Sequence, residues 1–182
     1  MIVFKLKAGT WDTGMMCNGF LAGLVAITAP CAFVTPIGAS IIGIVAGVLV
    51  VYSTFFIEKM GVDDVAGAIS VHGTAGAWGV LSVGLFACGE YGAGYNGVAT
   101  PVIGLFYGGG FAQLLMQIID LSVLVTWAFV VMYAWMKFSN LIVPIRPTKE
   151  EELKGLDATQ MGVLAYPDFQ PANPVPAPQF AD

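Results

Sequence analysis

Four long runs of apolar residues dominate the chain, and short segments containing polar residues, glycine or proline separate them. We expect these runs to form helices over residues 14–33, 37–57, 65–87 and 111–141. At about 1.5 Å per residue, runs of this length can cross a hydrocarbon core of roughly 30 Å. The pattern therefore predicts an all-α integral membrane protein with four transmembrane helices over residues 14–141.

The two flanking segments differ from this pattern. Residues 1–13 carry Lys5 and Lys7 around a short apolar patch that lacks the length of a secretory signal, so we expect a cytoplasmic approach loop. Residues 142–182 are polar and become rich in proline toward their end, which predicts a cytoplasmic tail with a disordered end.

Composition supports a membrane protein and excludes several other classes. Hydrophobic residues make up 57% of the chain and charged residues 10%, against roughly 25% charged in a typical soluble domain. The three cysteines, Cys17, Cys31 and Cys88, are too far apart for a zinc or redox motif, so we expect no metal and no cofactor. We expect no nucleic-acid partner.

The basic residues predict the orientation of the chain. Four spans place the N-terminal segment, the 58–64 turn and the tail on one side of the membrane. All seven basic residues fall on or next to that side: Lys5, Lys7, Lys59, Lys137, Arg146, Lys149 and Lys154. The positive-inside rule makes that side cytoplasmic, as expected for a multi-pass protein of the cell membrane.

His72 is the one histidine of the chain, and it lies inside the third apolar run. An ionisable group at membrane depth is costly and usually faces a bundle interior or an aqueous path. Its neighbours three and four residues away, Ala68, Ile69, Ala75 and Gly76, are mostly small, which suits either close helix contact or a narrow lumen. From these residues alone, a pore histidine and a histidine that packs against another helix remain equal alternatives.

Three aspartates are further candidates. Asp63 and Asp64 precede the histidine run, where carboxylates cap free amides and complement the helix dipole; a cation-binding pair is the less favoured alternative. Asp120 lies within the fourth run, where pairing with another helix is the expected role, and an approach to a loop and proton transfer are the alternatives.

Several segments resemble the C-terminal portion of the Amt/Mep/Rh family of ammonium transporters, in the family's order. They are NGFLAGLVAITAPCAFV (18–34), GASIIGIVAGVLVV (38–51), DDVAGAISVHGTAGAWGVLSVGLF (63–86), GLFYGGG (104–110) and GLDATQMGVLAYP (155–167). The resemblance implies the last four helices of an eleven-helix transporter fold, which forms a homotrimer with one pore per subunit. It also implies that ammonium loses its proton and that ammonia passes two stacked histidines.

The resemblance assigns roles residue by residue. His72 matches the second pore histidine, Leu21 and Ala68 match pore-lining positions beside it, and Asp63 and Asp64 match the cytoplasmic vestibule at the start of its helix. It further implies ammonium or ammonia as substrate, lipid as surroundings, and a nitrogen-signalling regulatory protein as a partner at the cytoplasmic face.

The sequence also departs from the family pattern. The first histidine, the outer recruitment site and its phenylalanine gate have no counterpart, so we expect a truncated or split portion that does not conduct alone. Val65 replaces a frequent proline, and Met161 a frequent histidine, which puts docking of the tail in doubt.

Other functions fit less well. A structural or regulatory membrane partner of full-length subunits is the main alternative. A water channel would need paired Asn-Pro-Ala turns, whereas Asn173–Pro174 lies in the tail. An enzyme is not expected, because no nucleophile and base pair can be proposed.

Overall fold

The structure is a computed structural model that describes residues 1–64, 66–94 and 97–163. Contacts divide the chain into two units, Met1–Thr126 and Trp127–Asp182, which are described separately. The helices described are α1 (Ile2–Ala8), α2 (Thr13–Thr28), α3 (Pro36–Lys59), the π-helix η1 (Ile69–Thr74), α4 (Ala75–Phe86), the 3-10 helix η3 (Leu105–Tyr107), α5 (Ala112–Ile142), α6 (Lys149–Lys154) and the π-helix η4 (Asp157–Met161). Within the described residues, β pairing is limited to an isolated bridge between Cys88 and Ile103.

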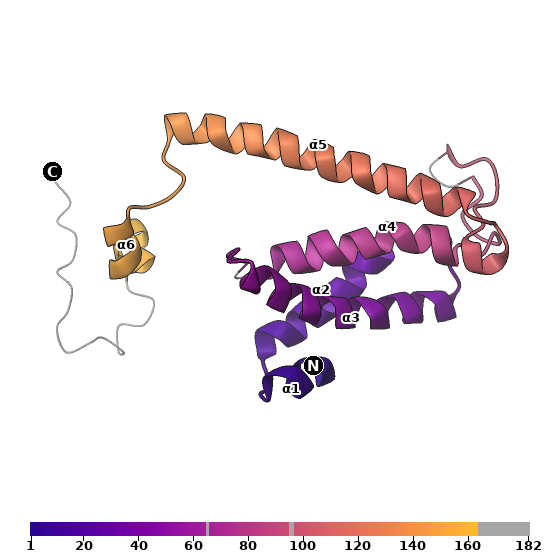
Figure 1. Ribbon diagram of the computed structural model, residues 1–182, viewed down its shortest axis with the longest axis horizontal. Coiled ribbons are helices and arrows are strands. Elements are labelled where there is room, and N and C mark those ends of the chain that lie inside the picture. Colours follow the sequence, from indigo (N-terminus) through magenta and orange to yellow (C-terminus); the bar gives the residue numbers. More distant parts are fainter. Residues whose placement is uncertain (65, 95–96, 164–182) are drawn as a thin grey trace. The chain divides into compact units, whose positions relative to one another are not determined.

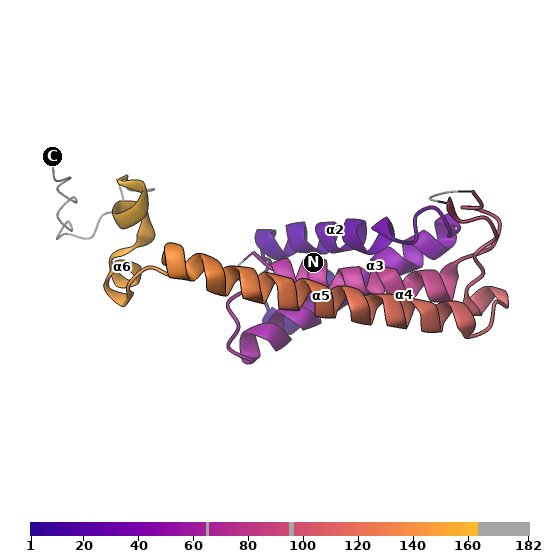
Figure 2. The ribbon, with the colours of Figure 1, turned by 90° about the horizontal axis from the view of Figure 1, so that it is seen from above.

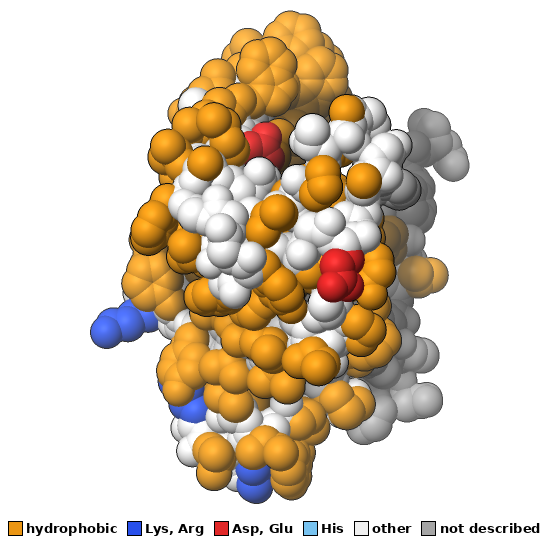
Figure 3. Space-filling model, turned by 90° about the vertical axis from the view of Figure 1, so that its right-hand side faces the viewer, with side chains coloured by type: hydrophobic (Ala, Val, Ile, Leu, Met, Phe, Trp, Pro, Cys, Tyr) orange, Lys and Arg blue, Asp and Glu red, His pale blue; other side chains and the backbone are white. Residues whose placement is uncertain are grey.

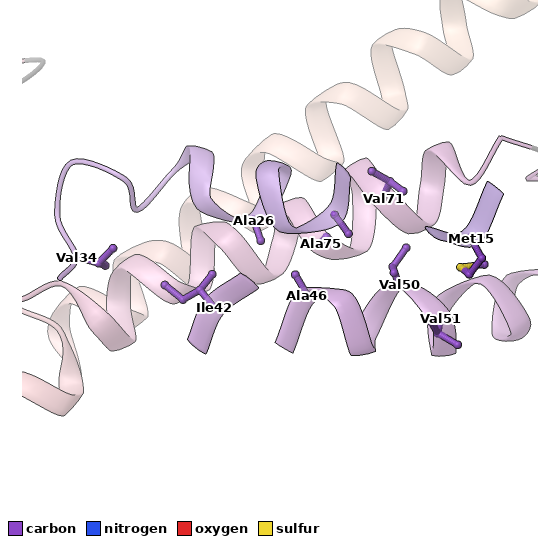
Figure 4. Packing of buried hydrophobic residues seen from close by; sticks show 10 residues of the cluster. Met15, Ala26, Val34, Ile42, Ala46, Val50, Val51, Val71 and Ala75 are labelled. Carbon is purple, nitrogen blue, oxygen red and sulfur yellow. The ribbon is translucent and has the colours of Figure 1, made fainter. Parts of the chain in front are cut away.

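Helices α2, α3 and α4 of the first unit pack side by side, and η1 joins them (Figures 1 and 2). Their shared core consists mainly of small and β-branched side chains, which let the helix backbones approach one another (Figure 4). The cluster contains Met15, Ala22, Ala26, Val34, Ile42, Ala46, Val50, Val51, Val71 and Ala75.

Glycine produces the closest of these approaches. A Cβ placed on Gly79 of α4 would lie 2.5 Å from the carbonyl oxygen of Ala26 in α2, so α4 lies directly against that carbonyl. Pro30 has no N–H and cannot donate to this oxygen four residues back. The Ala26 carbonyl, which has no helical donor because of Pro30, is therefore the point at which α2 and α4 touch.

The same proline accounts for the end of α2. The helix ends at Thr28, five residues before the expected end at 33, and a turn comes next in which the Phe33 amide donates to the Pro30 carbonyl at 2.8 Å. The N-terminal segment also differs from expectation. Residues 1–13 include the helix α1, which ends at Gly9 in the left-handed conformation, with φ of 78°.

The first unit holds α1 in place through ring contacts. The rings of Phe4 and Phe55 stack with centroids 5.7 Å apart, and the Lys7 ammonium lies 4.4 Å from the ring centroid of Tyr52. These contacts join residues that are far apart in the sequence, and they fold the segment onto α3.

Three helical stretches of the described residues are long and apolar enough to cross a membrane: Pro36–Lys59, Ile69–Phe86 and Ala112–Ile142. α2 is apolar but shorter, with 16 residues. Hydrophobic side chains also cover most of the face in Figure 3, with few charged groups among them. The exposed apolar surface agrees with a protein surrounded by lipid or by further helices.

The second unit contains the remainder of α5 and two short helices. Thr148 and Glu151 form a capping box at the start of α6, and Arg146 forms an ion pair with Glu152 at 2.8 Å. The tail beyond 163, which we expect to be disordered, lies outside the described residues.

Candidate functional site around His72

His72 lies on η1, inside the apolar stretch Ile69–Phe86, and its side chain is exposed. Ser70, Val71 and Ala75 around it are buried, so the segment packs against α2 and α3 while the imidazole points away from the core. Among the described residues, none forms a hydrogen bond with His72. A hydrogen bond from His72 to the carbonyl of another helix is therefore not found within the described part of the chain.

Leu21 and Ala68 come from α2 and from the residue before η1, two elements that are in contact. Leu21 lies on α2 and is 43% exposed, and Ala68 is exposed at the residue before η1. Met16, Cys17 and Phe20 line an open apolar hollow together with Leu21. The pore-lining positions that the resemblance implies are thus accessible rather than buried in the core of the unit.

Asp64 organises the start of η1. Its carboxylate accepts hydrogen bonds from the Ile69 amide at 3.0 Å and from the Ser70 amide and hydroxyl, each at 3.1 Å. Burial alone would raise the pKa of Asp64, but these hydrogen bonds outweigh it and hold the pKa below its ordinary value. Asp63, by contrast, is exposed.

The two aspartates predict a helix start at 65, but the regular helix begins at Ile69. The carboxylate of Asp64 reaches forward across five residues rather than the two or three of an ordinary cap. The first turn of this helix is a wide π-turn. The pattern of apolar residues in the sequence does not indicate it.

A cavity of about 310 Å³ lies at the same end of the unit, and the sequence interpretation missed most of it. Its polar lining consists of Asp12, Asn18, Thr54, Glu58 and Asp64. Asp12 caps α2 by accepting from the Met15 amide at 2.6 Å, and its place just before an apolar run is the signal that could have identified it. No group of three or more potential metal ligands occurs within 1–64, 66–94 and 97–163.

Asp120 lies on α5, and its side chain is exposed. Within the described part of the chain it forms no hydrogen bond or ion pair. The expected pairing with another helix is therefore not found among these residues, and its role remains a proposal.

The opposite end of the helices is held by polar and aromatic contacts. The Trp78 indole donates to the Ile42 carbonyl at 3.1 Å, and the hydroxyls of Thr35 and Tyr107 are 3.3 Å apart. Phe86 meets Phe106 edge to face, with ring centroids 5.0 Å apart. The Trp78 contact fixes α4 against α3, and the other two contacts join η3 to the start of α3 and to the end of α4.

The apolar helices define an all-helical membrane protein, and the exposed His72, which no described residue binds, lies within one of them. The sequence profile of the Ammonium Transporter Family matches residues 1–166, and the chain belongs to this family.

Individual relatives agree with this assignment. The chain is 44% identical over 169 residues to "Ammonium transporter Amt2" of Archaeoglobus fulgidus, which covers 93% of this chain and 36% of the relative. It is 39% identical over 152 residues to "Ammonium transporter" of Bacillus subtilis, covering 83% of this chain and 36% of the relative. The crystal structure of Saccharomyces cerevisiae Mep2 superimposes with a TM-score of 0.72 at 25% identity, covering 82% of this chain and 34% of that one. The chain thus spans about a third of the length of these relatives.

Proposed function

We propose that the chain takes part in transmembrane ammonium transport, in which ammonium loses its proton and ammonia passes His72 in a narrow apolar path. The observation that carries this proposal is the exposed imidazole, which no described residue binds, inside an apolar helix of a chain from the ammonium transporter family. Leu21 and Ala68 would line the path beside it, and Asp63 and Asp64 would border its cytoplasmic end.

The physical chemistry supports passage of the neutral molecule. A bare ammonium ion would lose its hydration in an apolar path at a cost of several kcal/mol, whereas ammonia is uncharged. A neutral imidazole can donate a hydrogen bond from one ring nitrogen and accept one at the other.

We further propose that the 182 residues do not conduct by themselves. The imidazole face is open in the first unit, so a closed path requires further helices, whichever polypeptide supplies them. In this proposal the helices match the last four of the eleven-helix fold, assembled as a homotrimer in the cell membrane with a cytoplasmic C-terminus. A nitrogen-signalling regulatory protein would bind at that side.

A chain swap tests this function. The stretch of the Archaeoglobus fulgidus relative that matches this chain is replaced by the 182 residues, and the chimera is reconstituted into liposomes. We expect ammonium-driven pH change or current from the chimera and none from the 182 residues alone. A correctly folded chimera without transport, beside an active relative, would overturn the proposal, as would conduction by the chain alone.

The second candidate is a structural or regulatory membrane partner of full-length subunits. The observation that favours it is α5, none of whose described side chains is buried, which leaves a long apolar helix free for contact. Co-purification with a full-length family member, without any transport by the chimera, would support this role instead.

A further inference from the structure

The segment that carries His72 is a π-helix rather than an α-helix. The Ala75 amide donates to the Ser70 carbonyl five residues back, so one extra residue is accommodated within the turn. This extra residue rotates the residues at the start of the turn relative to α4 by roughly 100°, because an α-helix turns through about 100° per residue. The direction of the imidazole therefore depends on this wide turn.

Polar contacts hold both ends of the turn. At its start, the Asp64 carboxylate accepts from the Ile69 and Ser70 amides. At its end, the Thr74 hydroxyl lies 2.7 Å from the Ser53 hydroxyl of α3. Thr74 comes two residues after His72, so this second contact lies close to the imidazole along the chain.

The Ser53–Thr74 contact differs from most of the hydroxyl contacts of the described membrane helices. Serine and threonine in a helix commonly donate to a carbonyl of their own helix. Ser40, Thr54, Ser82 and Ser122 do so here, each to the residue four positions back. Ser53 and Thr74 instead bond to each other across two helices.

We infer that Ser53 and Thr74 are positioning residues, which fix the rotation of the π-turn against α3 and thereby aim His72. The inference rests on the proposed function, because it assigns the aimed imidazole to the ammonia path. Neither residue contacts the substrate in this account. They act through the backbone between Thr74 and His72.

The single histidine provides a direct readout. The full chain is labelled with ¹⁵N-histidine and studied in lipid nanodiscs, where the imidazole nitrogens give one set of resonances. Thr74→Val and Ser53→Ala remove the contact, Thr74→Ser retains it, and Thr54→Val removes a hydroxyl at the adjacent position that bonds only within α3. Circular dichroism checks that each variant is folded.

We expect Thr74→Val and Ser53→Ala each to shift the imidazole resonances by more than a linewidth or to split them into two sets. Thr74→Ser and Thr54→Val should leave them in place. If either hydroxyl-removing variant fails to fold, the other decides. Unchanged resonances in a folded variant that lacks the contact, or an equal shift in Thr54→Val, would overturn the inference. Nuclear magnetic resonance does not measure transport, so this failure is distinct from failure of the proposed function.

Discussion

At the scale of single residues, the neighbouring aspartates are not equivalent. Asp64 accepts three hydrogen bonds at the start of η1, whereas Asp63 is exposed and makes none with the described residues. Two carboxylates of the same type therefore differ in how much each stabilises the histidine segment, although their positions in the sequence are adjacent.

Replacement of Asp64 should destabilise the fold more than replacement of Asp63. Asp64→Ala leaves the Ile69 and Ser70 amides without their acceptor and should cost about 1 kcal/mol, the typical value for a lost cap. Asp63→Ala is the matched control and should be nearly neutral. Thermal unfolding in detergent measures both, and equal losses in the two variants would contradict the assignment of the cap.

The lowered pKa of Asp64 predicts a dependence on pH. Because the folded pKa lies below the unfolded one, the stabilisation is fully present above the unfolded pKa and disappears as pH falls through the folded value. The difference in stability between the wild type and Asp64→Asn should therefore shrink as pH falls from 6 to about 3, near and below the ordinary aspartate pKa of about 3.9. A difference that stays constant over this range would show that the charge does not stabilise the turn.

At the scale of the elements, glycine decides how closely the helices pack. Gly79 lies against the Ala26 carbonyl, and a Cβ on Gly84 would lie 2.5 Å from the Cα of Leu114, at the start of α5. Backbone atoms cannot move aside as a flexible side chain can, so an added methyl group at these positions must separate the helices.

Gly79→Ala should therefore be destabilising, by about 1–3 kcal/mol as for other overpacked contacts. Gly47→Ala in α3 is the control, because a Cβ there meets no atom within 4 Å and alanine favours the helix. Unfolding of the two variants in the same detergent compares them. Equal stability of both variants would contradict the close contact of α4 with α2.

The sequence predicts some of these elements better than others. The second helix is expected over 37–57, and α3 extends over Pro36–Lys59, because an uninterrupted apolar run between a proline and charged residues marks both ends. The expected end of α2 is too late, since it gives the missing N–H of Pro30 less weight than the apolar residues after it. A π-helix of six residues is too short to produce a recognisable spacing of apolar residues. The turn around His72 could therefore not be predicted.

The candidate site is only partly accessible to sequence reasoning. Asp64 can be identified because a carboxylate before an apolar run is typical of a helix start. The lining of the cavity at the same end cannot, since Asp12, Asn18 and Glu58 come together only when α2 and α3 pack. The Ser53–Thr74 contact also escapes prediction, because 21 positions separate the two hydroxyls in the sequence.

At the scale of the whole molecule, the first unit presents an imidazole on an open face, and the chain covers about a third of its relatives' length. The proposed function explains both observations. Further helices would close the path over the open face, and His72 would be the polar group inside it.

The most direct test of this account is ammonium transport by the chimera with and without the imidazole. His72→Ala in the chimera should reduce the ammonium-driven pH change to the level of empty liposomes, while Ile44→Ala, a change at an exposed apolar position of α3, should leave transport largely intact. Equal transport by the intact chimera and its His72→Ala variant would contradict the claim that ammonia passes this histidine.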